Sequence, residues 1–260
     1  PFKEEDGGFG GSAVDLMAVM EEFGKGMVVE PFIPTGVISG GLITDLGSAE
    51  QKEALIGAIM EGSLQLATAY AEADSRYNLA AVGTTATKSG DEYVLNGTKI
   101  QVLNGPAADK LLVVARTSGG QFDRDGISVF IVDATATGIS KREYTNVDGH
   151  RAAEIHLKDV KVAASELLGA EGAALPALEA AIDRATLAVG AEAVGAMDSL
   201  LKKTVEYAKT RKQFGVAIGT FQALQHRMSE MFIECQLARS IVIMAAMKLD
   251  SSASVQEKAK

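Results

Sequence analysis

Residues 84–104 read TTATKSGDEYVLNGTKIQVLN, and this stretch decides the fold class because apolar and polar residues alternate along it. A period of two is typical of strands that bury one face. Two segments inside the stretch, Ser89–Asp91 and Asn96–Gly97, have the composition of tight turns between antiparallel strands. We therefore expect a hairpin unit here, with a turn at each segment.

Further strands are expected after this stretch. Several segments alternate or form short runs of Val, Ile and Leu, and Gly- and Asp-rich turns separate them. These segments are 111–116, 127–132, 139–144 and 153–162. Strands that follow one another through short turns predict an antiparallel β domain.

The residues that precede the β region have the periodicity of helices. In 12–23, SAVDLMAVMEEF, Ser12 is the expected N-cap, and the apolar residues at helical spacing, expected on one buried face, are Leu16, Val19, Met20 and Phe23. Ser48 and Gln51 open the segment SAEQKEALIGAIMEG at the spacing of a capping box. We expect a helix from each segment.

The residues that follow Gly169 are rich in Ala and Leu and predict two long helices. The first covers 180–210, where Arg and Lys near the end suit the negative end of the helix dipole. The second covers 221–249, and Gly215 separates the two. The expected buried side of the second helix consists of Leu224, Met228, Met231, Phe232 and Cys235.

The order of these patterns is helical, then β, then helical. We expect a helical domain over 1–65, a β domain over 66–166 and a second helical domain over 167–260. A chain of 260 residues is long enough for several such parts.

The composition argues against several classes of protein. Hydrophobic residues make up 47% of the chain and charged residues 23%, which is typical of soluble globular proteins. The net charge of -9 opposes general binding to nucleic acids. No apolar run approaches the roughly 20 residues that cross a bilayer, and the first residues lack the pattern of a secretory signal. We expect a cytoplasmic protein without a membrane span.

Cysteine and histidine bear on the redox setting and on metal binding. The single cysteine, Cys235, cannot form an internal disulfide, which fits a reducing compartment. His150, His156 and His226 lack Cys or carboxylate partners at ligand spacing, so no metal site is predicted. The glycines near the start lack the dinucleotide fingerprint, which disfavours NAD.

Three segments, in collinear order, carry a resemblance to a known family. Residues 91–117 read DEYVLNGTKIQVLNGPAADKLLVVART, residues 156–172 read HLKDVKVAASELLGAEG, and residues 207–231 read YAKTRKQFGVAIGTFQALQHRMSEM. The last contains Arg-x-x-Phe-Gly and then a Phe-Gln start to the next helix, as in the acyl-CoA dehydrogenase signature. The first two segments are similar to the β domain of that family and to the exit from it.

This resemblance implies an α+β fold with a helical N-terminal part, a central antiparallel β domain and a C-terminal helical bundle. Compared with the family, the chain is expected to be incomplete at both ends. The resemblance also implies FAD as cofactor, an acyl-CoA thioester as substrate, and an electron-transfer flavoprotein or similar acceptor. A homodimer, a homotetramer or a heteromer with a homologous subunit is expected.

In the family, a carboxylate removes the α-proton of the substrate while the flavin accepts a hydride from the β-carbon. Many members take this base from late in the C-terminal domain, which would place it beyond residue 260. A minority use a Glu immediately before a helix Arg that corresponds to Arg184, and Asp183 holds that place here. Asp183 is thus a candidate base, and a solvated Asp paired with Arg184 or Lys202 is the alternative. Arg184 is expected to contact the substrate.

The Arg-x-x-Phe-Gly segment of the family reaches the FAD of a neighbouring subunit. The resemblance assigns Arg211 to the pyrophosphate, with Gln213 and Phe214 nearby and Gln222 contributing from the next helix. Outside such a motif, Arg211 would compensate a helix C-terminus and Phe214 would be an ordinary core residue.

The flavin-facing segments of the β domain depart from the family pattern. In the first, which contains Tyr70 and Ala71, the alanine replaces a hydroxyl residue that bonds the flavin ring. Ser75 and Arg76 occupy the ligand-facing turn and are expected to contact the substrate. In the second segment Leu103 stands where the family has a hydroxyl, so main-chain groups are expected to bind the flavin there.

These departures are similar to those of small subunits that act on pimeloyl-type dicarboxylic or steroid-derived acyl-CoAs beside a dissimilar large subunit. Two functions stay open. One is a catalytic acyl-CoA dehydrogenase, and the other is a noncatalytic or flavin-sharing subunit of a heteromeric dehydrogenase. A different substrate for the same fold and flavin is a third alternative, because fold alone does not fix function.

Overall fold

A computed structural model describes residues 2–252 of the chain. The chain forms two compact units, one made of Pro1–Gly10 and Val29–Ala185 and the other of Gly11–Val28 and Thr186–Lys260. The boundary between them falls inside a single long helix, α4, Leu175–Thr210. The expected division at residues 65 and 166 groups the residues differently and stays a prediction.

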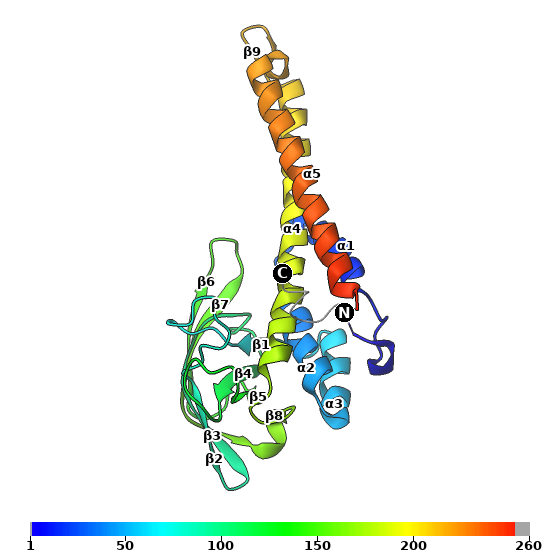
Figure 1. Cartoon of the computed structure of the whole chain (residues 1–260). Helices are drawn as coiled ribbons and strands as arrows, with labels where there is room; N and C mark the ends of the chain where they lie inside the picture. Colours follow the sequence, from blue (N-terminus) through cyan, green and yellow to red (C-terminus); the bar gives the residue numbers. More distant parts are fainter. Residues whose placement is uncertain (1, 253–260) are drawn as a thin grey trace. The chain divides into compact units, whose positions relative to one another are not determined.

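The first unit is built on a largely antiparallel sheet (Figure 1). Its strands are β1 Leu66–Ala69, β2 Thr85–Ser89, β3 Glu92–Leu103, β4 Lys110–Arg116, β5 Ile127–Asp133, β6 Ile139–Thr145, β7 Arg151–Ala163 and β8 Leu167–Leu168. They lie in the order β6-β7-β3-β2-β4-β5-β8, and β1 also pairs with β4. The sheet departs from the expected antiparallel pattern at two places, because β1 and β2 both pair with β4 in parallel.

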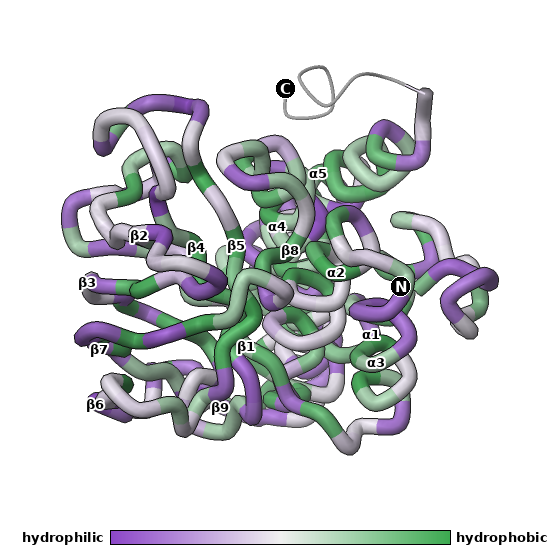
Figure 2. Tube along the Cα trace, turned by 90° about the horizontal axis from the view of Figure 1, so that it is seen from below, coloured by the Kyte–Doolittle hydropathy of each residue, from purple (hydrophilic) through white to green (hydrophobic). Residues whose placement is uncertain are grey.

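Side chains of the central strands form the core of the β domain. Every residue of β4 from Leu111 onward is buried, and so is β5 as far as Val132. Figure 2 shows the corresponding hydrophobic runs along these two strands. The ring of Tyr93 lies 4.9 Å from that of Phe130, measured between centroids. Each such side chain contributes about 1.5–3 kcal/mol when it leaves water, which makes this region the main source of stability in the unit.

The turn expected at Asn96–Gly97 is wrong, because β3 continues through these residues. The pairing of β3 with β7 shifts register between Leu95 and Gly97, where Lys158 and Asp159 stand opposite Asn96, so the bulge lies on β7. A Cβ atom at Gly97 would lie 2.4 Å from Oγ1 of Thr84. The glycine therefore permits a close approach of two chain segments, and only the turn at Gly90 joins β2 to β3.

Helices complete the first unit. They are η1 Glu4–Asp6, the π-helical turn η2 Ile33–Ser39, α2 Gly40–Leu46, α3 Ala49–Met60 and the turn η3 Ala164–Glu166. The predicted capping box is confirmed, since Ser48 accepts a hydrogen bond from the Gln51 amide and Gln51 accepts one from the Ser48 amide. The amide group of Gln51 also donates to the carbonyls of Ser165 and Leu167, which ties α3 to the end of the β domain.

The second unit consists of α1 Ala13–Gly26, the part of α4 from Thr186, the hairpin strands β9 Lys212–Gln213 and β10 Val216–Ala217, η4 Ile218–Thr220 and α5 Gln222–Asp250. Ser12 and Asp15 form a capping box at the start of α1, so the predicted N-cap is confirmed. Helices α1 and α4 cross at backbone contact. A Cβ atom at Gly24 would lie 1.8 Å from the Glu192 carbonyl oxygen, and one at Gly195 would lie 1.9 Å from that of Glu21.

The expected buried side of α5 is only partly correct. Cys235 is buried, but Leu224 is 38% and Phe232 54% exposed. The neighbouring helices of this unit cover one side of α5 and leave the other side to solvent. Across residues 2–252, no helix combines the length and the hydrophobicity required to span a membrane.

Candidate functional site

Asp183 is a half-buried acid on α4, in the part of the helix that belongs to the first unit. Burial raises the pKa of its carboxyl group, the nearby charge of Glu179 raises it further, and Arg184 opposes both. Its carboxylate makes no hydrogen bond to any residue that the structure describes. A carboxyl group in such a place has the raised basicity that a general base requires.

Two ion pairs surround Asp183 and leave it unpaired. Nη2 of Arg184 lies 2.7 Å from Oδ2 of Asp45, on α2. One turn earlier on α4, the carboxylate of Glu179 accepts two hydrogen bonds from Arg124, at 2.8 and 2.9 Å. The expected pairing of Asp183 with Lys202 does not occur, because Lys202 pairs with Asp198 at 2.8 Å. Sequence reasoning did not identify Asp45, which lies far from Arg184 along the chain.

The loop that follows β1 contains the first expected flavin-facing segment. Tyr70 is half-buried, and burial raises the pKa of its hydroxyl group. The carbonyl oxygen of Ala71 accepts a hydrogen bond from the amide of Ile100 at 2.9 Å. This bond places the loop beside β3, which also carries Leu103. The structure thus brings Tyr70, Ala71 and the second expected segment to one region of the sheet.

The next turn of the same loop positions Ser75 and Arg76 differently from each other. Ser75 is buried, and its hydroxyl group accepts from the Glu72 amide and donates to the Glu72 carbonyl. Arg76 is exposed and has a left-handed backbone with φ of 49°. Ser75 therefore stabilises the turn, while the guanidinium group of Arg76 is free to meet an anionic ligand.

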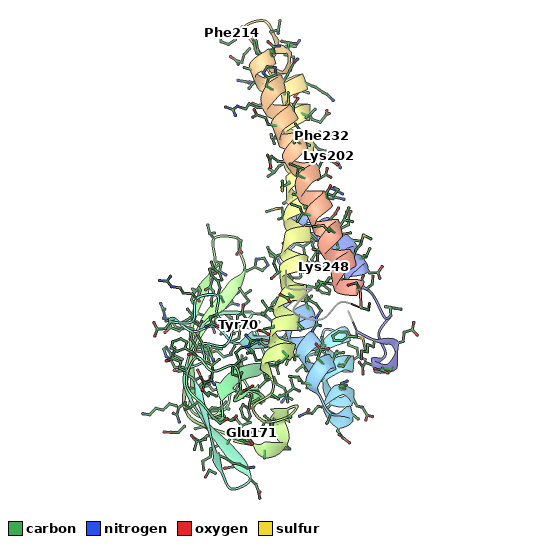
Figure 3. The ribbon with its side chains drawn as sticks, viewed as in Figure 1. Tyr70, Glu171, Lys202, Phe214, Phe232 and Lys248 are labelled. Atoms are coloured by element: carbon green, nitrogen blue, oxygen red, sulfur yellow. The ribbon has the colours of Figure 1, made fainter. Side chains whose placement is uncertain are left out.

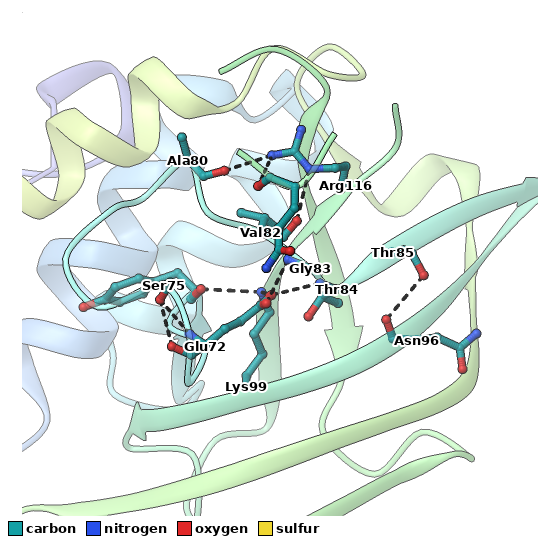
Figure 4. Close-up of polar contacts among 12 residues, drawn as sticks. Glu72, Ser75, Ala80, Val82, Gly83, Thr84, Thr85, Asn96, Lys99 and Arg116 are labelled. Carbon is teal, nitrogen blue, oxygen red and sulfur yellow. Dashed lines mark hydrogen bonds and ion pairs between the residues drawn. The ribbon is translucent and has the colours of Figure 1, made fainter. Parts of the chain in front are cut away.

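A buried ion pair lies beneath this loop. Nζ of Lys99 is 2.6 Å from Oε1 of Glu72, and the side chains are 0% and 12% exposed. Figure 4 shows the Glu72 carboxylate between Lys99 and the amides of Gly83 and Thr84, which donate to it at 2.8 and 3.0 Å. Burial lowers the pKa of Lys99 to about 8, although Glu72 opposes this change. Burial also opposes ionisation of Glu72, but Lys99 and Thr84 outweigh it and lower the pKa of the carboxyl group.

Arg116 anchors the end of the same loop without an acidic partner. Its buried guanidinium group donates to the carbonyls of Val82 at 3.1 Å and Ala80 at 2.9 Å (Figure 4). It also donates to carbonyls of the following loop, at Ser118, Gln121, Asp123 and Asp125. The burial of Arg116 and Lys99 was not predicted from the sequence, although a Lys and an Arg within otherwise apolar strand patterns are a signal for buried, paired charge.

The second expected segment carries an irregular backbone. Gln101 and Asn104 have φ angles of 53° and 61°, and the β3–β7 register shifts between Lys99 and Val102. Leu103 is half-buried and lies opposite Ala152 in the ladder. Left-handed backbone at non-glycine residues is uncommon and concentrates at ligand sites.

The Arg-x-x-Phe-Gly segment belongs to the second unit and forms the hairpin between α4 and α5. Phe214 is 91% exposed with φ of 53°, and its ring contacts that of Phe221 edge-on at 6.2 Å. Figure 3 shows Phe214 at the tip of this hairpin. Arg211, Gln213 and Gln222 are also exposed, and Arg211 has no ion pair among the residues that the structure describes. The four residues are thus brought together, with their functional groups open to a ligand.

Within residues 2–252, no group of three or more His, Cys, Asp and Glu side chains has a geometry that could hold a metal ion.

Comparisons with known proteins match the chain along its length. Three family models match it: the N-terminal domain of acyl-CoA dehydrogenases over residues 1–63, the middle domain over 67–160 and the C-terminal domain over 171–260. A probable acyl-CoA dehydrogenase of Bacillus subtilis, YngJ, is 32% identical over 251 residues, which is 95% of this chain and 66% of that protein. The CarC subunit of the caffeyl-CoA reductase-Etf complex of Acetobacterium woodii is 31% identical, over 97% of this chain and 68% of its own length.

A solved structure has the same arrangement of elements. The FAD complex of PigA superimposes with a TM-score of 0.92 at 26% identity, over 100% of this chain and 69% of that one. The chain thus spans about two thirds of the length of the relatives that it matches.

Proposed function

Because the chain belongs to the acyl-CoA dehydrogenase family, we propose that the whole protein is an FAD-dependent acyl-CoA dehydrogenase that converts an acyl-CoA thioester to the 2,3-enoyl-CoA. Relatives named as acyl-CoA dehydrogenases support this reaction class. The Etf complex of the related CarC supports an electron-transfer flavoprotein as the acceptor.

The residues present fit FAD. The unpaired guanidinium group of Arg211 and the exposed ring of Phe214 suit a diphosphate and an aromatic surface. The half-buried Tyr70 and Leu103 offer apolar surface, and the irregular backbone beside Leu103 offers main-chain groups in place of the missing hydroxyls. We propose that Tyr70, Ala71 and Leu103 face one FAD, and that Arg211, Gln213, Phe214 and Gln222 contribute to the FAD of a neighbouring subunit. When bound, FAD would supply the acceptor for the hydride from the substrate's β-carbon.

The single observation that carries the proposal is the environment of Asp183. An unpaired, half-buried carboxylate with a raised pKa, beside an Arg that is held by Asp45, suits a base that takes a proton from carbon. In this mechanism Asp183 removes the α-proton, and the charge that builds on the thioester oxygen requires hydrogen-bond donors near it. Arg184 contributes positive charge toward the CoA end of the substrate, and the exposed Arg76 contacts the substrate.

A test compares Asp183→Asn with Asp198→Asn. Asp198 lies on the same helix but pairs with Lys202, so its variant controls for loss of a carboxylate from α4. The purified protein is mixed without oxygen with a panel of short, long, dicarboxylic and steroid acyl-CoAs, and flavin absorbance is followed. We expect bleaching by at least one substrate in the wild type and in D198N, and a rate at least about 100-fold lower in D183N, the range expected for loss of a general base. Equal rates in D183N and D198N would show that a residue other than Asp183 acts as the base.

The second candidate, a flavin-sharing or noncatalytic subunit of a heteromer, is favoured by one observation. The loop residues that would bind the flavin ring through hydroxyls are Ala71 and Leu103, so this chain offers fewer side-chain donors than the family pattern. Wild-type protein that binds FAD only with a larger copurifying homologue, and that bleaches only in that complex, would support the heteromer.

A further inference from the structure

The Lys99–Glu72 ion pair has no role in the proposed chemistry, yet it is the most deeply buried charge pair among the described residues. Taking two charges out of water costs free energy that well-packed apolar residues would not incur. The pair therefore need not stabilise the fold, and a role in fixing the local structure explains it better.

The contacts of the pair join three chain segments. Glu72 lies in the loop after β1, and its carboxylate accepts hydrogen bonds from the amides of Gly83 and Thr84, just before β2. Lys99 lies in the middle of β3 and also reaches the carbonyl oxygen of Tyr70 at 3.4 Å. One pair of side chains thus closes both ends of the loop onto the strand.

The same loop and strand carry the residues expected to face the flavin. The Ala71 carbonyl accepts from the Ile100 amide, directly after Lys99. The irregular backbone that leads to Leu103 begins at Lys99, where the register with β7 shifts. A movement of Lys99 or Glu72 would therefore displace both expected flavin-facing segments relative to each other.

We propose that the Lys99–Glu72 pair is a positioning device that holds the Tyr70–Asn78 loop against β3 and thereby sets the affinity of the β-domain flavin surface. The inference about affinity rests on the proposed function, whereas the holding of the loop does not. Neither residue touches the reacting atoms, so both act through the loop.

The test uses Lys99→Met combined with Glu72→Gln, because the double variant leaves no buried charge unpaired and the amide oxygen at position 72 can still accept hydrogen bonds from the Gly83 and Thr84 amides. Tyr93→Phe is the matched control. Tyr93 is a buried residue of the same strand whose hydroxyl group donates to Glu171 at 2.8 Å, away from the loop. Three quantities are measured on the purified protein: the urea midpoint of unfolding, hydrogen exchange of the loop amides without flavin, and the Kd for FAD.

We expect the double variant and Y93F to unfold at similar urea concentrations. Only the double variant should show at least tenfold faster exchange in the Tyr70–Asn78 loop and at least a tenfold higher Kd for FAD. Unchanged exchange and Kd in the double variant, or equal changes in Y93F, would overturn the proposal. If the wild type does not bind FAD, the proposed function and the inference about affinity fail together, while hydrogen exchange still decides whether the pair holds the loop.

Discussion

Glu72, in the loop between Tyr70 and Thr84, is mostly buried and paired with Lys99, whereas the cations of the hairpin between Arg211 and Gln222 are exposed and have no ion pair among the described residues. Glu72 has three donors around its carboxylate, from Lys99, Gly83 and Thr84. Arg211 has no acidic partner among the described residues, and the neighbouring Phe214 is 91% exposed. Both regions carry residues expected to bind FAD. Only in the loop does the chain itself provide partners for the Glu72 carboxylate.

The difference separates two ways to build a binding site. A region whose polar groups are satisfied by the chain is formed before the ligand arrives. Mutations there should lower the free energy of unfolding, and they should weaken ligand binding only because the region is less well formed. A region with unsatisfied cations and exposed rings gains its partners on binding, so its residues affect binding with little effect on folding. Mutations in the loop should therefore change mainly the free energy of unfolding, and mutations in the hairpin mainly the free energy of ligand binding.

The largest effect is expected from Lys99→Met alone. This variant leaves Glu72 buried without a counter-charge, which typically costs about 3–5 kcal/mol in the free energy of unfolding. Urea unfolding at pH 7 measures the change, and Lys99→Met combined with Glu72→Gln is the comparison because it leaves neither buried charge behind. A loss below about 1 kcal/mol in K99M would show that the loop region is no better organised than the hairpin.

The pH dependence sharpens this prediction. In the wild type the pKa of Glu72 is lowered, so its contribution to stability is present above its ordinary pKa of 4.5 and is lost as the pH falls through the lower, folded value. Without Lys99, burial dominates and raises the pKa of Glu72. The loss of stability from burying an unpaired carboxylate is then present only above that raised pKa. The difference in stability between wild type and K99M should therefore shrink as the pH falls from 7 toward 5. A difference that does not depend on pH would exclude Glu72 as the cause.

Secondary structure was largely predictable because local pattern and tertiary packing agree. The strands at 111–116 and 127–132, the Ser12 N-cap and the Ser48–Gln51 capping box were predicted from periodicity and cap chemistry. The Asn96–Gly97 turn was not, because a glycine is also required inside a strand where a neighbouring segment, here at Thr84, approaches closely. The helical residues Ile33–Leu46 escaped prediction, since a buried, Gly-interrupted apolar run has no helical period on one face.

The candidate site was predictable only where a motif carried it. Family resemblance pointed to Asp183 and Arg211 from the residues around them. The pairs Arg184–Asp45 and Lys99–Glu72 were not predicted, because their members come from distant segments and only the fold brings each pair together. The apolar side of α5 was expected to be buried for a related reason: periodicity identifies an apolar face but not what covers it.

A smaller and different effect is expected from Arg211→Gln. Its charge should interact with an anionic ligand rather than with the chain, so the free energy of unfolding should change by less than about 0.5 kcal/mol. Loss of one charge-assisted hydrogen bond costs about 1.5–3 kcal/mol, which corresponds to roughly 10- to 100-fold weaker FAD binding. Isothermal titration calorimetry at two salt concentrations measures the loss of FAD affinity and how far salt reduces it. Lys212→Gln, one residue along the same exposed hairpin, is the control; equal effects from both variants would indicate general charge rather than a specific contact.

The smallest effect is expected from Arg227→Ala, which removes the ion pair with Glu230 near the start of α5. Both side chains are largely exposed, at 78% and 61%, and their closest atoms are 3.0 Å apart. Water screens such a pair, and holding two long side chains in one geometry costs entropy, so the loss of stability should be below about 0.5 kcal/mol. Thermal unfolding of R227A beside Glu230→Ala and the double variant isolates the pair interaction. A coupling of several kcal/mol would mean that charges near the hairpin do stabilise the chain, and the contrast with the buried Lys99–Glu72 pair would then disappear.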